Sequence, residues 1–409
     1  MKLILIFLCQ TAGILIGLAN VLAEERQLTV DEIVTKALDA SPIVKEIEAS
    51  RAVRSADAFD AKALLNPTLE TEHGVPSAWK EQRGDNETSV SLAQPFRLSH
   101  GTLRNRVASL LEQTGSVERD QSILELISKT RFAFARLWLL TERERILKQT
   151  QPKAKSLESF VVSGVQQGGY GAGDAAVFKA EIGRAEAEIL DIAAEKLEAE
   201  TELAALTGLD VGNITLANPG SPKSISTNLV EEQLSNNALK VQARAKTLFE
   251  LAKAELAVAN RDAFPELRPK LFYSRTNEGV DIVGFGISFD LPFYSQNTSE
   301  RIRKGAGLRA TEAATNFVQG DVFKASVLKS VRQYELRREE LAIYQKRIIP
   351  AIQEALSAFE SQVRAGQGSV FQLWQTLREY LDANEKYLER WSKAFAGYEQ
   401  LSILLGQEL

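Results

Sequence analysis

The sequence predicts a mainly helical α+β fold in which one structural unit occurs twice along the chain. Three observations predict it: a repeat with an almost constant shift of 198 residues, long stretches of helical periodicity, and two pairs of short alternating strands. The matched segments are Asn66-Pro67 with Phe264-Pro265, Val90-Ser91-Leu92 with Ile287-Ser288-Phe289, Val165 with Val363, Gly168 with Gly366, and Leu206-Thr207-Gly208 with Leu404-Leu405-Gly406. The strand segment is shifted by 197 residues, so the second unit lacks one residue before this segment and regains one before Val363.

The repeat divides the chain into four predicted segments: a signal peptide over 1–23, a first repeat over 24–217, a linker over 218–228, and a second repeat over 229–409. Lys2 precedes a long apolar stretch, and Ala23 offers the small residue that signal cleavage needs. A transmembrane anchor is the alternative, since the stretch is nearly long enough to span a bilayer. We favour cleavage after Ala23. The mature chain would then have no Cys, because Cys9 lies in the apolar stretch, and no lipid anchor.

The composition argues against several classes of function. Charged residues make up 25% of the chain and the formal net charge is -5, so a basic surface for nucleic acid is not expected. Two His, one Cys and one Met are too few for a zinc site, a Cys/His catalytic pair or a thioether metal cluster. The sequence also contains no recognisable Ser/His/Asp arrangement or phosphate loop. We therefore expect no enzymatic activity, cofactor or bound metal.

In the first repeat, helical spacing predicts a helix over about 28–64, with Thr29 or Asp31 as its cap and a break or kink at Pro42. The elements that follow are strands at about 68–76 and 87–96, a long helix at 101–166, a glycine-rich turn at 168–174 and a return helix at 175–206.

The second repeat predicts the same order of elements. Its parts are a helix at about 229–262, strands at 268–276 and 281–291, a long helix at 297–363, a short turn at 366–368 and a helix at 370–405. Apolar residues in these helices are spaced by threes and fours, which suits antiparallel coiled-coil packing. An ordinary helical bundle explains the same spacing.

The strands alternate strictly between apolar and polar residues. The side chains predicted to face lipid are Val90, Leu92, Phe96, Val283, Phe285, Ile287, Phe289 and Leu291. The opposite face carries Glu70, Glu72 and Asp290, which suits a water-filled lumen. A soluble sheet covered by helices gives the same alternation, but a run of about ten residues also matches a tilted membrane-spanning strand.

Four strands cannot close a barrel, and open strand edges do not survive in lipid. The chain is therefore expected to share a barrel with copies of itself. Two copies would give eight strands, whose interior is filled by side chains, whereas three would give twelve, with room for a channel. We favour three.

These features together resemble the TolC-type outer membrane efflux proteins. The resemblance rests on the duplicated order of elements, on Pro95-Phe96 and Pro292-Phe293 closing the second strand of each pair, and on the Leu-x-Gly ends of both repeats. It covers about 28–408. The segments Leu92–Leu98, Arg104–Ala108 and Ala263–Leu267 look most similar to the CzcC-like heavy-metal efflux branch.

The resemblance implies a homotrimer, with a twelve-stranded β-barrel in outer membrane lipid and a helical tunnel across the periplasm. It also implies a periplasmic adaptor and an inner-membrane pump, commonly of the resistance-nodulation-division type. Adaptor contacts are expected at the two turns, where the matching residues are Val165, Gly168, Gly171, Asp174, Val363, Gly366 and Ser369.

Some relatives narrow the tunnel entrance with aspartates just after the second turn. Gln372 and Gln375 stand at those positions here, so the resemblance does not imply an acidic ring. Asp174 is the nearest acidic candidate for an entrance constriction. Its position also suits a helix cap, which we favour.

The function expected from these features is a passive exit duct for substrates that a pump exports, with heavy-metal cations among the candidates. One alternative keeps the outer membrane channel but makes a secreted protein its cargo, as in type I secretion. Another is a soluble periplasmic coiled-coil adaptor or scaffold.

Overall fold

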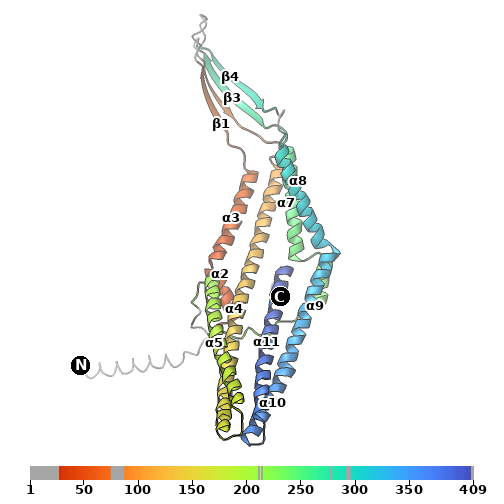
Figure 1. Cartoon of the computed structure of the whole chain (residues 1–409). Coiled ribbons are helices and arrows are strands. Elements are labelled where there is room, and N and C mark those ends of the chain that lie inside the picture. Colours follow the sequence, from red (N-terminus) through yellow and green to blue (C-terminus); the bar gives the residue numbers. More distant parts are fainter. Residues whose placement is uncertain are drawn as a thin grey trace, which may run out of the picture. The chain divides into compact units, whose positions relative to one another are not determined.

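The computed structural model describes residues 27–74, 87–210, 212, 215–276, 279–291 and 296–406 (Figure 1). The predicted signal peptide and the Pro292-Phe293 pair lie outside these residues. The chain forms two compact units. We call Met1–Lys45, Ile123–Thr227 and Leu328–Leu409 the hairpin unit, and Glu46–Ser122 with Asn228–Val327 the sheet unit. Each unit therefore draws on both sequence repeats.

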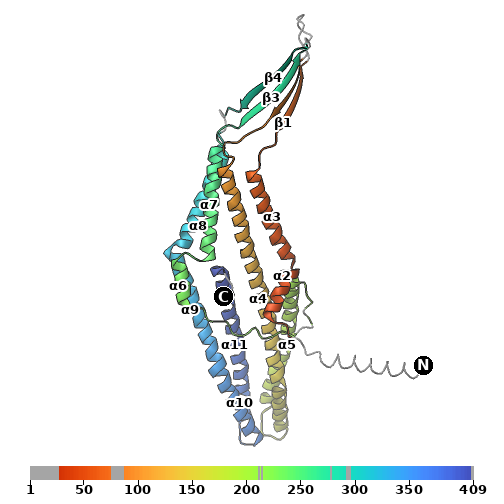
Figure 2. The ribbon, with the colours of Figure 1, turned by 180° about the vertical axis from the view of Figure 1, so that it is seen from behind.

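The hairpin unit consists largely of long antiparallel helices. α4 (Thr102–Gln166) enters it at Ile123 and turns back as α5 (Ala172–Thr207), while α10 (Ile349–Arg364) turns back as α11 (Val370–Leu405) (Figure 2). α2 (Val30–Ala40) packs against α5. The predicted helical hairpins of both repeats are thus confirmed.

Aromatic residues hold the centre of the hairpin unit. Trp391 is only 1% exposed, and its ring stacks on Phe395 with a centroid distance of 5.0 Å. The Trp138 ring lies 4.9 Å from the Trp391 ring, so α4 and α11 share one core. The Trp391 indole N–H donates a hydrogen bond to the Gly220 carbonyl at 2.9 Å. The segment between the repeats is therefore fixed to the C-terminal helix.

The first predicted helix is divided where the sequence places its proline. Thr29 caps α2 in a reciprocal box with Glu32, whose carboxylate accepts from the Thr29 N–H at 3.0 Å. α3 (Pro42–Lys62) starts at the proline itself. Proline lacks a backbone N–H, but the first residue of a helix makes no hydrogen bond within the helix through its N–H, so none is lost.

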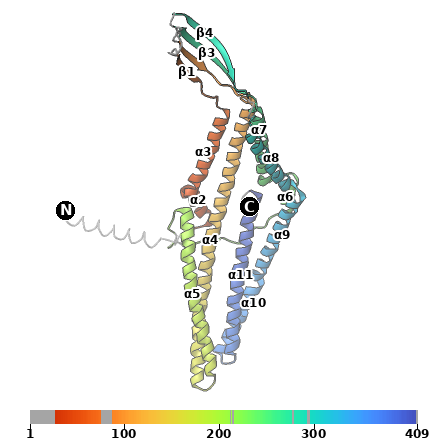
Figure 3. The same cartoon turned by 45° about the horizontal axis from the view of Figure 1, so that its top comes forward.

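The sheet unit contains one four-stranded antiparallel sheet in the order β1-β2-β3-β4 (Figure 3). Its strands are β1 (Thr68–Gly74), β2 (Glu87–Ala93), β3 (Leu267–Thr276) and β4 (Asp281–Phe289). β2 and β3 pair with each other at the centre, although they come from different repeats. β1 and β4 are the two edge strands, so four strands per chain are confirmed and the sheet of one chain is open.

The helices of the sheet unit come directly before or after its strands along the chain. The first part of α4 packs between α3 and α7 (Lys240–Arg261) in an apolar cluster that includes Ala58, Val107, Leu111 and Leu251. α7 also packs along α8 (Thr298–Gln319). Among the described residues, no helix combines the length and the apolar character that crossing a membrane requires.

Two predicted helices of the second repeat are interrupted, which corrects the sequence analysis. The helix expected over 229–262 is α6 (Thr227–Ser235) followed by α7, because Asn237 adopts a left-handed φ of 49° between them. The helix expected over 297–363 ends at Gly320, which has an extended ψ of 159° and separates α8 from α9 (Asp321–Ile343). A π-helical segment, η1 (Tyr344–Ile348), then joins α9 to α10.

Candidate functional site

The two helix–helix turns of the hairpin unit share one backbone design. Gly168 and Gly366 have φ values of 79° and 71°, which only glycine adopts readily. Each donates its N–H back to a valine carbonyl, Val165 and Val363 respectively, at 3.1 Å. The repeat therefore predicts not only the positions of these tips but also their geometry.

The helices that leave the tips are capped differently. Gly171 is the N-cap of α5, and its N–H donates to the Asp174 carboxylate at 3.0 Å. Ser369 caps α11, and its hydroxyl accepts from the Gln372 N–H at 3.4 Å. Asp174 is thus not the N-cap residue that the sequence suggested; it lies in the first turn of α5, where its carboxylate accepts the hydrogen bond from the N-cap residue Gly171.

The polar residues proposed for an entrance are all exposed. Asp174, Gln372 and Gln375 lie on the surface of the hairpin unit. The Gln375 amide donates to the Glu379 carboxylate at 3.5 Å, one helical turn away. The carboxylate of Glu379 therefore lies one helical turn after Gln375, which occupies a position where some relatives have an aspartate.

The two tips are joined by packing just behind the turns. The Phe178 and Trp374 rings lie 4.7 Å apart, and both belong to a buried cluster drawn from α4, α5, α10 and α11. Lys153 and Glu360 form an ion pair at 3.0 Å between α4 and α10. The hydrogen bond from Lys153 holds the pKa of Glu360 below its usual value of 4.5.

One face of the sheet consists of exposed apolar side chains. Leu69, Leu92, Leu271 and Phe285 form one row across all four strands, and each is at least half exposed. The other predicted lipid-facing residues are also exposed, by 38% to 79%: Val90, Phe96, Val283, Ile287, Phe289 and Leu291. Among the described residues of the sheet unit, no helix covers this face, which does not match the alternative of a helix-covered soluble sheet.

The opposite face is more polar and contains one tight contact. A Cβ placed on Gly284 would lie 2.2 Å from the Phe272 ring, whereas one on Gly286 would lie 3.5 Å from the nearest atom, in Lys270. Arg268 forms an ion pair with Asp290 at 3.0 Å on this face. The glycine pattern of β4 thus makes room for side chains of β3.

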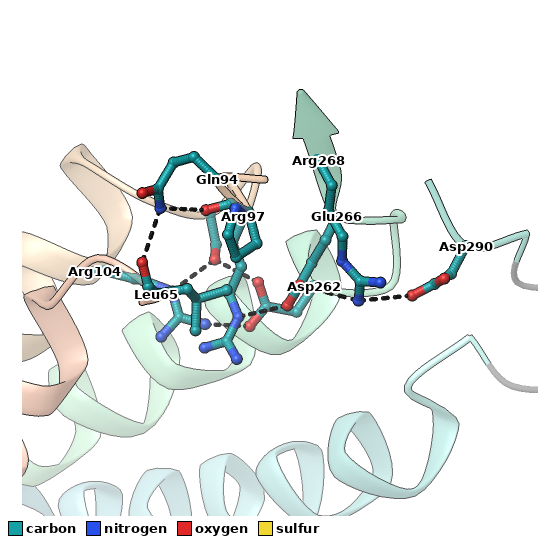
Figure 4. A network of polar contacts seen from close by, with 10 residues as sticks. Leu65, Gln94, Arg97, Arg104, Asp262, Glu266, Arg268 and Asp290 are labelled. Carbon is teal, nitrogen blue, oxygen red and sulfur yellow. Dashed lines mark hydrogen bonds and ion pairs between the residues drawn. The ribbon is translucent and has the colours of Figure 1, made fainter. Parts of the chain in front are cut away.

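A polar network ties the base of the sheet to the helices (Figure 4). Arg104 at the start of α4 pairs with Asp262 after α7 at 2.6 Å, and both also contact the Ser99 hydroxyl. Arg97 pairs with Glu266 at 2.9 Å just before β3. This network could not be predicted from the repeat, because Arg104 has a counterpart in Arg301 but its partner Asp262 has none: Leu64 stands at the matching position of the first repeat.

The two histidines do not form a metal centre in the part of the chain that the structure describes. His73 Nδ1 lies 2.9 Å from the Thr88 hydroxyl on the neighbouring strand. Over the described residues, no group of three or more His, Cys, Asp or Glu side chains is placed to hold a metal ion.

No family model matches the chain, and no curated protein sequence matches it significantly. Solved structures, however, match nearly its whole length. The outer membrane protein VceC of Vibrio cholerae is 15% identical, with 92% of this chain and 96% of that chain covered and a TM-score of 0.73. The Neisseria gonorrhoeae MtrE outer membrane channel is 16% identical, with 93% and 89% covered and a TM-score of 0.73. The Campylobacter jejuni CmeC outer membrane channel is 12% identical, with 93% and 86% covered and a TM-score of 0.70.

These matches agree with the order of elements, the four-stranded sheet and the paired hairpins described above. This chain therefore has the fold of the TolC-type outer membrane efflux channels.

Proposed function

We propose that this protein is the outer membrane exit duct of a tripartite efflux system in a Gram-negative bacterium. Three copies share a twelve-stranded barrel in the outer membrane, and their helical hairpins form a tunnel into the periplasm. The duct conducts passively, and an inner-membrane pump of the resistance-nodulation-division type supplies the energy. A signal peptide cleaved after Ala23 directs the chain across the inner membrane.

The exposed apolar face of the sheet carries this proposal. Leaving a large aliphatic or aromatic side chain in water instead of burying it costs about 1.5–3 kcal/mol. Each of the four strands has one exposed apolar side chain in the row that contains Leu69 and Phe285, so this free-energy cost arises once in every strand. Lipid removes it, provided that the open edges of β1 and β4 are also paired, because unpaired backbone groups are not tolerated in hydrocarbon. Membrane insertion and sharing of the sheet between copies therefore belong together.

The tips are the proposed contact with the periplasmic adaptor. Each turn has a glycine of positive φ, Gly168 or Gly366, and the helices that follow the turns carry exposed apolar side chains. Phe371 is 68% exposed and Val177 is 54% exposed, each within the first two turns of the helix that follows a tip. An adaptor that covers both turns would bury these residues.

The channel activity is tested by reconstituting purified protein into planar lipid bilayers. The proposal expects stable, step-like ionic conductance. Protein that folds but never conducts would favour the alternative of a soluble periplasmic scaffold.

The cargo is tested separately, by deleting the gene and measuring sensitivity to metals, dyes and antibiotics. The similarity to the CzcC-like branch makes divalent metal cations the first substrates to examine. Sensitivity to metals alone supports metal efflux, whereas sensitivity to dyes and antibiotics supports drug efflux. A deletion strain that instead fails to release a secreted protein would support type I secretion.

A further inference from the structure

Two prolines occupy the same position in the helical hairpins of both repeats. Pro152 lies inside α4, and adding the repeat shift of 198 residues leads to Pro350, the second residue of α10. Each proline stands sixteen residues before the glycine of its tip, Gly168 or Gly366. Proline has no N–H and its ring crowds the preceding helical turn, so it weakens a helix interior. Both helices that lead to the tips therefore contain a weak point at the same distance from the tip.

The backbone adapts to each proline in a different way. Near Pro152, the buried Thr150 hydroxyl donates back to carbonyl groups of its own helix. Before Pro350, the chain forms the π-helical segment η1, and the N–H of Ile349 donates to the Tyr344 carbonyl. Prolines and π-helical turns are the usual places at which a long helix bends. Both hairpins can therefore bend on the side that leads to the tip.

The apolar packing of the hairpin unit also changes at the prolines. We call the cluster around Trp391 the central core and the cluster around Trp374 the tip cluster. α4 passes from the central core at Leu147 to the tip cluster at Ala154, and its proline lies between them. The second hairpin makes the same passage over 341–356, whose first residue belongs to the central core and whose last residue belongs to the tip cluster. This range contains η1 and the second proline.

The return helices pass between the two clusters differently. On α5, Phe178 belongs to the tip cluster and Ile189 packs against the central core. Gly183 lies between them, with open space where a Cβ would stand, and glycine weakens a helix interior. On α11, Tyr380 packs against the tip cluster and the next residue, Leu381, packs against the central core. α11 is therefore the continuous connection between the two clusters.

A polar contact between α4 and α5 also spans the region of the first proline. The Glu186 carboxylate accepts from the Gln151 amide at 3.3 Å and pairs with Lys155 at 2.9 Å. Both side chains of this ion pair are about half exposed, and exposed pairs contribute little to stability. This contact can therefore break and reform at a small cost.

Beyond the prolines, the two hairpins are bound to each other. The Phe178 and Trp374 rings, 4% and 8% exposed, join α5 to α11. The ion pair between Lys153 and Glu360 joins α4 to α10, and Lys153 directly follows the first proline. Separate movement of the two hairpins would expose the rings to water and break the ion pair. The contacts thus favour a joint movement of both tips.

We propose that residues 153–178 and 351–380 form one tip bundle, which pivots as a single body about Pro152 and Pro350 with α11 as the connection. The hinge depends on contacts within the hairpin unit alone, and its use in the duct rests on the proposed function. A periplasmic partner that binds either turn would then swing both hairpins of that copy together.

Amide hydrogen exchange tests this movement, because local opening sets the exchange rate of helix amides. The full-length oligomer in detergent is compared with Pro152→Ala and Pro350→Ala, and peptides from each helix are followed by mass spectrometry. Each substitution supplies the missing N–H and removes the ring from the preceding turn. We expect exchange beside the substituted proline to slow by about tenfold.

The decisive measurement is made in the hairpin that was not changed. If the two hairpins pivot as one bundle, Pro152→Ala also slows exchange in η1, and Pro350→Ala also slows exchange over 148–153 of α4. An effect confined to the substituted hairpin would overturn the proposal and favour hairpins that move separately. Uniform exchange along α4 in the unchanged protein would overturn it as well.

Pro42→Ala is the matched control, because Pro42 is exposed and only begins a helix. It should leave exchange in both hairpins unaltered. If it slows exchange there as much as the other substitutions do, the effect is general and the hinge is wrong. The exchange measurement does not depend on conduction. Coupled slowing in a protein that never conducts keeps the hinge and contradicts the duct, whereas conduction without coupled slowing keeps the duct and contradicts the hinge.

Discussion

Arg104 and Asp262 form an ion pair at 2.6 Å that joins the first repeat to the second. Their side chains are only 13% and 22% exposed, so water screens the pair weakly. Arg104 opens the long helix α4, and Asp262 follows the end of α7 beneath the sheet. The pair therefore lies where α4 and α7 adjoin the strands, and it joins α4 of the first repeat to the end of α7 in the second repeat.

Removing one partner of this pair should destabilise the protein clearly. Arg104→Ala leaves the Asp262 carboxylate without its main partner at a poorly hydrated site, and we expect a loss of about 3 kcal/mol. Urea unfolding of the purified protein measures the change. Lys62→Ala is the matched control, because its contact with Glu112 is 4.0 Å long and well exposed, and its loss should stay below about 1 kcal/mol. Equal effects of the two substitutions would contradict a special role for Arg104.

The glycines of β4 should differ in their tolerance of a methyl group. Gly284→Ala places a carbon against the Phe272 ring and should cost about 1–3 kcal/mol through overpacking. Gly286→Ala should be close to neutral, since its nearest neighbours are the flexible carbons of Lys270. The yield of folded protein in the outer membrane reports the difference. Adding Phe272→Ala to Gly284→Ala should restore the yield, and a failure to do so would show that the contact is not the cause.

Acid should loosen the hairpin unit. Hydrogen bonds from Lys148 and Lys196 hold the pKa of Glu144 below its usual 4.5. A carboxylate with a lowered pKa in the folded state stabilises the fold above its unfolded pKa, and this contribution disappears as the pH falls through the folded pKa. Stability measured by urea unfolding should therefore fall as the pH drops below about 4.5. Glu144→Gln should make that fall smaller, and an equal fall in both proteins would contradict the role of Glu144.

Asp174 allows its capping role to be separated from a role in the entrance. Asp174→Asn keeps an oxygen that can accept from the Gly171 N–H, whereas Asp174→Ala loses the cap at a cost of about 1 kcal/mol. We expect faster amide hydrogen exchange in the first turn of α5 for the alanine variant only. Single-channel conductance and cation selectivity should be unchanged in the asparagine variant. A clear loss of cation selectivity in that variant would instead assign Asp174 to the constriction.

The sequence predicts most of the elements of this fold because each element occurs in both repeats, so the assignment in one repeat can be compared with that in the other. It does not predict the interruption at Gly320. Single glycines such as Gly115 and Gly183 lie inside uninterrupted helices, so one glycine does not reveal where a helix ends. The network around Arg104 also escapes prediction, since Arg104 and Asp262 are more than 150 positions apart and the repeat does not duplicate the pair. Contacts between the ends of helices and the ends of strands can be identified only from the three-dimensional structure.

The assembly state in the outer membrane tests the central claim most directly. Membrane fractions are separated by density, and the outer membrane fraction is run on detergent gels with and without heating. Our account predicts that the protein is found in the outer membrane and migrates as a trimer until it is heated, when it becomes a single chain. Recovery of the protein as a freely soluble periplasmic monomer would contradict the account.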